Sequence, residues 1–112
     1  MMELTRGDIC LVNFNPAKGG EIGKLRPAII MSEVEANNAF DTVIVVPLST
    51  VIEPDALPYR YTITKRESLK YDSDACINEV RSLSKNRVKE MLAILDQEEL
   101  GIIQKALCQQ LQ

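Results

Sequence analysis

One arginine follows a glycine-rich stretch, and no other residue of this sequence is better placed for chemistry. Residues 19–23 hold three glycines and Glu21, and Lys24 leads on to Arg26-Pro27 and the apolar run 28–31. Glycines cost backbone entropy, and proline pushes the residue before it towards extended backbone. We therefore expect a loop that delivers Arg26 to the start of a buried strand. An always-charged guanidinium there suits a phosphate or a carboxylate.

The chain contains no histidine. This removes the commonest general base and metal ligand, so Ser–His, Cys–His and paired-histidine hydrolases are excluded. Any catalysis must use carboxylate, arginine, lysine, hydroxyl or tyrosine. No Cys, Asp or Glu cluster has metal-ligand spacing, so we expect no metal and no cofactor. The scattered Cys10, Cys76 and Cys108 are expected to be buried free thiols.

Length and composition indicate one globular domain over residues 1–112, with 46% hydrophobic and 26% charged residues. No apolar run reaches the roughly 18–20 residues that span a bilayer, and no signal peptide is visible. A cytoplasmic protein without membrane contact is therefore expected. The net charge of −3 argues weakly against nucleic acid, but the basic stretches 60–70 and 81–89 form either one basic face or two solvated edges.

Short apolar and alternating segments predict a mainly β (α+β) fold, a small antiparallel barrel or curled sheet with a C-terminal helix. Loops of this length leave no room for crossover helices, so the strands must pair antiparallel. Pro47 is expected to end the third strand. Asp96 and Glu99 predict a capping box, followed by a helix that packs on its leucines and isoleucine. The expected strands are 8–13, 26–32, 42–48, 59–64, 75–83 and 90–95, with a loop over 33–41, and Tyr59 is expected to pack in the core.

Several short motifs resemble those of the MazF/PemK toxins, which are sequence-specific endoribonucleases (mRNA interferases) of type II toxin–antitoxin systems. The motifs are Arg6-Gly7-Asp8, Asn15-Pro16, Gly19-x-Glu21, Arg26-Pro27 and Pro47-x-Ser49-Thr50. The resemblance covers nearly the whole chain. It implies a homodimer of SH3-like barrels that cleaves single-stranded RNA without metal and is silenced by a cognate antitoxin protein.

The resemblance also implies a catalytic pair. The family's loop arginine falls on Arg26, and its threonine falls on Ser49, with Thr50 directly beside it. An arginine–aspartate pair that some members use would fall on Cys76 and Asn78 and is absent here. Glu79 stands where a glutamine is frequent, so recognition of the RNA sequence is expected to differ.

The chemistry can be argued independently of the family. RNA is cleaved when its 2′-OH attacks the adjacent phosphate, and the enzyme must stabilise charge on the phosphorane oxygens. Arg26 and a hydroxyl of Ser49 or Thr50 suit that task, and Glu21 is a candidate base. The candidate RNA-binding residues are Phe14, Lys24, Asn78, Glu79 and Arg81.

Structural roles remain open for the same residues. Arg26 can pair with Glu21, Arg81 can pair with Glu79, and the two hydroxyls can cap a turn. Two other functions also remain open: a toxin on the same barrel that poisons DNA gyrase, and a non-catalytic member that only binds nucleic acid or protein.

Overall fold

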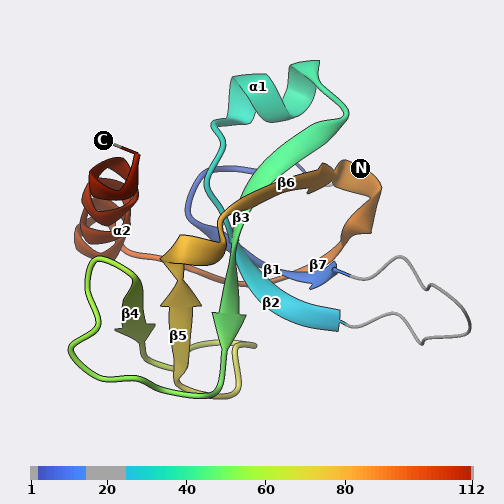
Figure 1. Ribbon diagram of the computed structural model, residues 1–112. Coiled ribbons are helices and arrows are strands. Elements are labelled where there is room, and N and C mark those ends of the chain that lie inside the picture. Colours follow the sequence, from blue (N-terminus) through green and yellow to red (C-terminus); the bar gives the residue numbers. More distant parts are fainter. Residues whose placement is uncertain (1–2, 15–24, 112) are drawn as a thin grey trace, which may run out of the picture.

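The computed structural model describes residues 3–14 and 25–111, in which short strands form a curled sheet with a helix on one side (Figure 1). Two α-helices and two short 3-10 turns accompany the strands. The strands are β1 Asp8–Asn13, β2 Leu25–Ile30, β3 Thr42–Ser49, β4 Arg60–Ile63, β5 Ser73–Cys76, β6 Arg81–Ser84 and β7 Val88–Ile94; the helices are α1 Val34–Ala39 and α2 Gln97–Gln110, and the 3-10 turns are η1 Ile77–Glu79 and η2 Lys85–Arg87.

Every strand pairing in the sheet is antiparallel. The strand order is β4-β5-β3-β2-β1-β7, and β6 pairs with β3. Strand β3 changes partner along one edge: β6 pairs with it as far as Val45, and β5 pairs with it from Leu48. Among the described residues no pairing joins β7 to β4 or β6, so the curled sheet is open. The predicted antiparallel curled sheet with a C-terminal helix is confirmed.

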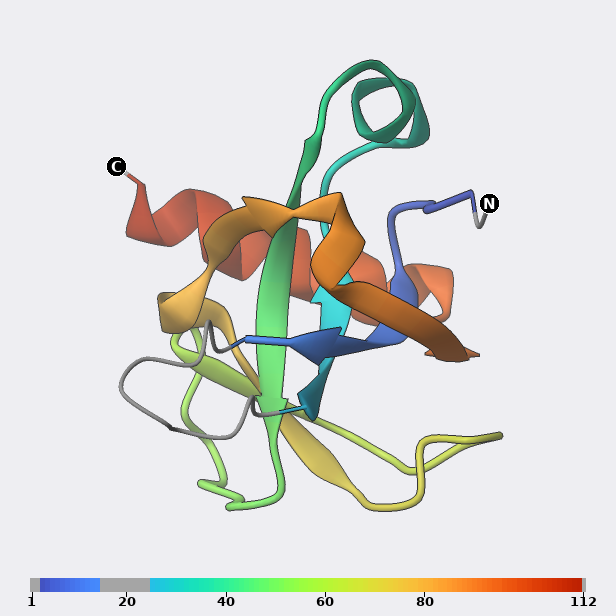
Figure 2. The same cartoon turned by 90° about the vertical axis from the view of Figure 1, so that its right-hand side faces the viewer.

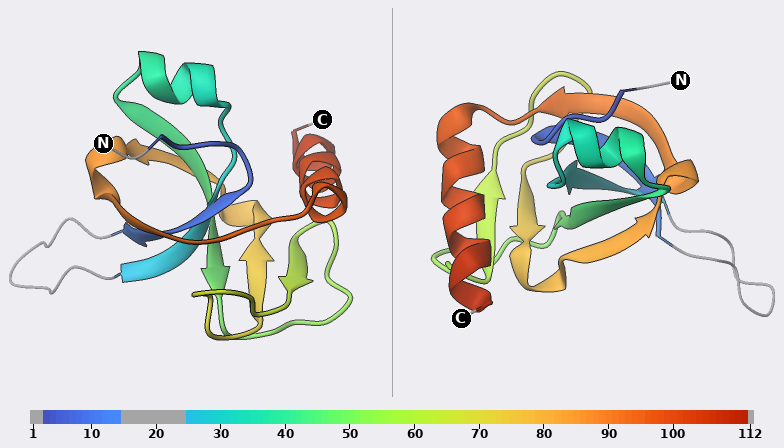
Figure 3. Two further views of the ribbon diagram at one scale, coloured as in Figure 1. Left: turned by 180° about the vertical axis from the view of Figure 1, so that it is seen from behind. Right: turned by 90° about the horizontal axis from the view of Figure 1, so that it is seen from above.

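The core has two parts, one on each face of the sheet. On one face Leu100, Ile103 and Ala106 of α2 pack against apolar side chains that include Ile63 and Leu48. Figure 3 shows α2 lying alongside β4 and β5. The other face forms a second cluster: Leu4, Cys10, Val12, Ala28, Ile30, Val43, Val45 and Leu83, with Phe14 and Val88 against it.

The corner before β1 needs its glycine. Gly7 has a φ of 98°, which side-chain-bearing residues rarely adopt. Its N–H donates to Ile30 O (2.8 Å), and its carbonyl accepts from Leu95 N (2.9 Å). The Asp8 carboxylate accepts from Thr5 N at 2.9 Å, and burial raises the pKa of Asp8. The motif Arg6-Gly7-Asp8 therefore builds the corner before β1, where Gly7 bonds to the end of β2 and to the residue that follows β7.

Two expectations about secondary structure were wrong. Residues 33–41 are not a loop throughout, because they contain α1. This helix is held by the buried Asn37 amide, which donates to Leu4 O and Ser32 O, both at 2.9 Å. The single strand expected over 75–83 is two strands separated by η1. The turn begins where Ile77 N and Asn78 N both donate to Tyr59 O. It leads from β5, which pairs with β4 and β3, to β6, which pairs with β3.

Pro47 does not end the third strand. It pairs with Ala28, and the strand continues to Ser49. Met31 N donates to Ile44 O, so Met31 and Ile44 are a hydrogen-bonded pair. Hydrogen-bonded and non-hydrogen-bonded pairs alternate along an antiparallel ladder, which makes Ala28 and Pro47 a non-hydrogen-bonded pair. The Pro47 nitrogen therefore points away from β2, to the edge of β3 that pairs with β6 and β5. Pro47 lies between the segments paired with β6 and with β5, so its missing N–H removes no ladder hydrogen bond.

Three expectations about burial and packing also fail. Leu111 lies beyond α2 and is 76% exposed, and Tyr59, which we expected in the core, is 57% exposed. Cys10 and Cys76 are buried free thiols as expected, but Cys108 is exposed. Neither helix in the described part of the chain has the length and apolar character to cross a membrane.

Candidate active site

Strands β2 and β3 stop pairing near the residues that the sequence singled out. The register runs from Ile30 opposite Val45 to Ala28 opposite Pro47 and then ends. Arg26 lies two residues before Ala28 on β2, and Ser49 lies two residues after Pro47 on β3. The two strands separate here: the beginning of β2 and the end of β3 overlap in the view of Figure 2 but lie apart in Figure 1. Since strand side chains alternate between faces, Arg26 and Ser49 project on the same face of the sheet, and both are half-buried.

The same face continues over the next two strands. Ser49 is opposite Asp74 on β5, and Asp74 is opposite Thr62 on β4. Cys76 is opposite Arg60 in the same ladder. Cross-strand partners share a face, so polar side chains of four strands gather on the face opposite α2.

The turn after β3 fixes the Ser49 side chain. The Ser49 hydroxyl oxygen accepts from Val51 N at 3.1 Å, and the Val51 carbonyl accepts from Arg60 Nη1 at 3.0 Å. Glu53 N donates to Asp74 Oδ2 at 2.8 Å. Thr50 lies after the strand and is exposed, and among the described residues its hydroxyl makes no hydrogen bond. The Ser49 hydroxyl is therefore part of this hydrogen-bond network, whereas the Thr50 hydroxyl lies outside it.

Asp74 is the buried centre of this network. Its side chain is 0% exposed, and its Oδ1 accepts from the Thr62 hydroxyl at 2.5 Å. Arg60 Nη1 lies 3.6 Å from Asp74 Oδ2, and Arg60 Nε lies 3.7 Å from Glu53 Oε2. A buried carboxylate costs free energy unless it is hydrogen-bonded and paired, and Asp74 meets both conditions.

Two guanidinium groups act on the Cys76 thiol. Burial raises the pKa of Cys76, the positive charges of Arg60 and Arg26 oppose that rise, and Glu79 adds to it. Arg26, Arg60 and Glu79 therefore lie near one thiol. Within residues 3–14 and 25–111 the Arg26 side chain makes no hydrogen bond or ion pair, so its guanidinium donors are available to a ligand.

The other candidates divide into two groups. Phe14 and Arg81 lie together, with the guanidinium carbon 5.6 Å from the ring centroid, a cation–π contact. Asn78 and Glu79 are exposed on η1, and in the described residues Glu79 makes no ion pair with Arg81. Glu21 and Lys24 lie outside the described residues.

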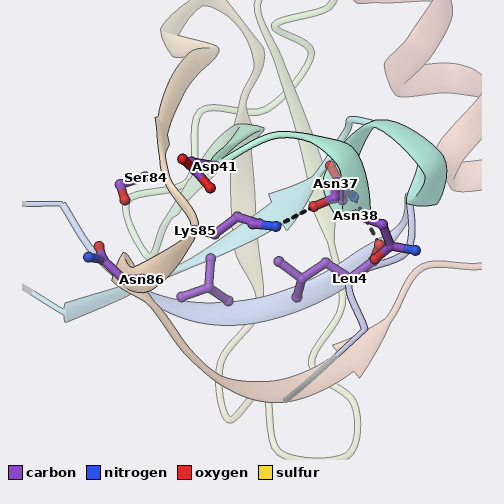
Figure 4. Close-up of a pocket in the computed structure, with 8 residues that line it drawn as sticks. Leu4, Asn37, Asn38, Asp41, Ser84, Lys85 and Asn86 are labelled. Atoms are coloured by element: carbon purple, nitrogen blue, oxygen red, sulfur yellow. Dashed lines mark hydrogen bonds between the residues drawn. The ribbon is translucent and has the colours of Figure 1, made fainter.

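A cavity of the described structure lies away from these residues. It has a volume of about 600 Å³ and is lined by Leu4, Asn37, Asn38, Asp41, Ser84, Lys85, Asn86 and Val88. Figure 4 shows Lys85 extended towards α1, where its ammonium donates to Asn37 O at 2.6 Å. None of the predicted site residues lines this cavity, and we do not assign the chemistry to it. Among the described residues no group of Cys, Asp and Glu is arranged to hold a metal ion.

Comparison with known proteins identifies the family of this chain. Residues 5–111 match the family described as PemK-like, MazF-like toxin of type II toxin–antitoxin system. The chain belongs to this family. It is also 31% identical over 105 residues to Endoribonuclease MazF of Staphylococcus saprophyticus, covering 93% of this chain and 88% of that one. The predictions of a MazF-like toxin and of an endoribonuclease are therefore confirmed.

Solved structures of MazF share the fold. MazF from Deinococcus radiodurans (Form-I) superposes with a TM-score of 0.78 at 23% identity, covering 99% of this chain and 98% of that one. A MazE-MazF structure from the same organism (Form-II) gives a TM-score of 0.81 at 21% identity, covering 99% and 97%. At this identity the likeness supports the fold alone.

Reasoning from sequence missed two residues of the site, Arg60 and Asp74. Arg60 was noted only as one charge of a basic stretch. Asp74 carried a usable signal, because it stands directly before the expected strand 75–83, and a carboxylate that is buried beside such a strand needs a partner. Identifying that partner required the register between β4 and β5.

Proposed function

We propose that this toxin cleaves single-stranded RNA in a sequence-specific, metal-independent reaction, with Arg26 and Ser49 as its catalytic residues. The observation that carries the proposal is their placement. They lie on the same face of the sheet, where β2 and β3 separate. Arg26 has no protein partner in the described part of the chain, and the Ser49 hydroxyl is oriented by Val51 N.

The reaction starts from the RNA itself, whose 2′-OH attacks the adjacent phosphorus while the 5′-oxygen leaves. The Arg26 guanidinium donates two N–H groups to the phosphorane oxygens. The Ser49 oxygen already accepts from Val51 N, so its O–H can donate to a non-bridging oxygen. The products carry a 2′,3′-cyclic phosphate and a 5′-OH.

Two roles depend on residues outside the described part of the chain. We propose that Glu21 accepts the 2′-OH proton and that Lys24 contacts a phosphate. For the proton that the leaving 5′-oxygen requires, we propose Arg26 as the donor.

Binding of the RNA bases is proposed for a second set of residues. The Phe14 ring can stack on a base, and the Arg81 guanidinium beside it adds positive charge. Asn78 and Glu79 expose an amide and a carboxylate on η1, and both groups can hydrogen-bond base edges.

The proposed partners are a second copy of the chain and an antitoxin. A homodimer is supported by exposed apolar side chains, among them Leu25, which is 53% exposed next to Arg26. The Deinococcus MazE-MazF structure supports a cognate antitoxin, and we propose that an acidic, disordered segment of it folds over Arg26. Because the substrate is cellular RNA, we propose a cytoplasmic location.

Digestion of a long single-stranded RNA by the purified protein, with every end mapped, tests the activity. We expect cuts at one short recurring sequence, with 5′-OH ends. Intact RNA would contradict the proposal, and a gyrase inhibition assay on the same preparation would then test the non-nuclease alternative. Size-exclusion chromatography with light scattering measures the dimer.

Competition tests the antitoxin site. A peptide from the cognate antitoxin should block cleavage and displace a single-stranded oligonucleotide, with an affinity that falls as salt rises. Simultaneous binding of peptide and oligonucleotide would place the two sites apart.

A further inference from the structure

We propose that Arg60, held in place by the buried Asp74, is a second phosphate-binding guanidinium of this site and contacts an RNA phosphate next to the one on which Arg26 and Ser49 act. This inference rests on the proposed function. It assigns a binding role to Arg60 and a positioning role to Asp74.

Arg60 is in the right part of the fold. On β4 it is opposite Cys76, and Thr62, two residues further along the same strand, is opposite Asp74. Asp74 in turn is opposite Ser49. Arg60 therefore shares the face of the sheet with Ser49 and Arg26, and the charges of both arginines act on the Cys76 thiol.

The surroundings fix the Arg60 guanidinium without using all its donors. Nη1 donates to Val51 O at 3.0 Å, whereas the carboxylates of Asp74 and Glu53 lie 3.6 and 3.7 Å away. Both charge contacts are longer than a hydrogen bond. Nη2 has no hydrogen-bond partner among the described residues, and the side chain is 19% exposed. A fixed cation with free N–H donors suits a phosphate.

Asp74 can position the Arg60 guanidinium because hydrogen bonds and burial fix the Asp74 carboxylate. Its two oxygens accept from the Thr62 hydroxyl and from Glu53 N, and its side chain is fully buried. A buried carboxylate strongly favours a cation beside it. The Glu53 carboxylate, 63% exposed, is screened by water and competes less with a phosphate.

The network also links Arg60 to the reacting hydroxyl. Arg60 bonds the carbonyl of Val51, and the N–H of the same residue bonds the Ser49 oxygen. A phosphate on Arg60 would therefore bind beside the turn that orients Ser49. Arg60 and Asp74 thereby supply an arginine–carboxylate pair in a site where Cys76 and Asn78 replace the pair of some family members.

Salt-dependent RNA binding tests the phosphate contact. The probe is a short RNA that contains the mapped cleavage sequence, with a single 2′-deoxy sugar at the attacking position so that it is not cut. Arg60→Met should weaken binding about tenfold, as for one charge-assisted hydrogen bond. It should also reduce the slope of log affinity against log salt by about 0.7, the value for one phosphate contact to a single strand. Lys105→Met, which removes one exposed charge from α2, should leave both unchanged.

Two further variants separate contact from folding. The double variant Arg60→Met/Asp74→Asn removes the cation together with the buried negative charge. It should show the same reduced salt slope of RNA binding as Arg60→Met, and it should unfold at the wild-type midpoint. Asp74→Asn alone keeps Arg60 charged, so the slope should stay wild-type while KM rises more than kcat falls.

The outcomes separate the two proposals. An active wild type whose Arg60 variants keep the full slope and affinity would overturn the role of Arg60 and leave the nuclease proposal intact. A wild type that leaves RNA uncut overturns the proposed function, and the second guanidinium with it.

Discussion

The backbone N–H of Val51 donates to the Ser49 hydroxyl oxygen at 3.1 Å. A hydroxyl that accepts one hydrogen bond still has its proton to donate, and the accepted bond limits the directions in which it can do so. Ser49 lacks the second Cβ substituent that stiffens threonine, and this contact supplies part of the missing restraint.

The first prediction assigns the reacting hydroxyl. Ser49→Ala should lower the cleavage rate by roughly 100-fold, as for loss of one transition-state donor, whereas Ser49→Thr should retain or raise it. Thr50→Val should change the rate little, because Thr50 lies beyond the strand and outside the network. Single-turnover cleavage of a mapped RNA measures all three. A dead Thr50→Val beside an active Ser49→Ala, both folded, would reverse the assignment.

The second prediction concerns the geometry of Arg26. Arg26→Lys should be nearly as damaging as Arg26→Ala, each lowering the rate by roughly 100-fold or more, because lysine keeps the charge and loses the planar fork. Thermal unfolding should barely change, since the Arg26 side chain makes no hydrogen bond or ion pair to other described residues. A lysine variant with most of its activity would reduce Arg26 to an electrostatic contact.

The third prediction concerns metal. Cleavage should proceed fully in excess EDTA, because the proposed mechanism uses only Arg26, a hydroxyl and a proton acceptor. The fragments should carry 2′,3′-cyclic phosphate and 5′-OH ends, which end-specific labelling detects. Activity that disappears with chelator and returns with Mg²⁺ would contradict this mechanism.

The sequence predicts those parts of the fold that local patterning determines. The alternation over residues 59–64 and the capping box of Asp96 and Glu99 are local signals, and both β4 and α2 form. The helix α1 depends on the hydrogen bond from the Asn37 side chain to Leu4 O. These two residues are distant in sequence, so no local pattern predicts the helix. The prediction that Pro47 ends the third strand failed for a similar reason. A proline is tolerated at this position only because β3 changes its pairing partner there.

The candidate site was predictable in part. The motifs point to Arg26 and Ser49 because both are defined by short neighbouring patterns. The Arg60–Asp74 pair was not predicted, since residues 14 positions apart come together only through the pairing of β4 and β5. The variants of Ser49, Thr50 and Arg26 described above test which of the predicted residues carry out catalysis.

The fourth prediction concerns an ion pair that joins a turn to α2. Arg66 donates from both Nη atoms to the Glu99 carboxylate, at 2.5 and 2.7 Å, while Glu99 also caps Asp96 N. These Arg66 hydrogen bonds lower the pKa of Glu99 below its ordinary value of 4.5, although partial burial opposes them. Since the pKa is lower in the folded state, the stabilisation is complete above the unfolded value and is lost as pH falls through the folded value.

Glu99→Gln should therefore lower the free energy of unfolding by roughly 1–2 kcal/mol at pH 7. The difference from wild type should shrink as the pH falls below 4.5. Urea unfolding at both pH values measures it. Glu98→Gln, in the same turn but exposed, is the control and should stay within about 0.5 kcal/mol. Equal losses for Glu99→Gln at pH 7 and pH 3 would show that the charge does not matter.

The fifth prediction compares two glycines with opposite requirements. Gly101 is exposed inside α2, and a Cβ built there meets no atom within 4 Å. Gly101→Ala should raise the free energy of unfolding by about 0.5–1 kcal/mol, because alanine loses less backbone entropy on folding. Gly7→Ala, at a φ of 98°, should instead destabilise the protein by roughly 1 kcal/mol or more.

Thermal unfolding of both variants measures the contrast, and RNA cleavage by Gly101→Ala should stay at the wild-type rate because α2 lies on the opposite face from Arg26 and Ser49. A Gly101→Ala protein no more stable than wild type would show that the helix needs its glycine for a contact outside the single chain.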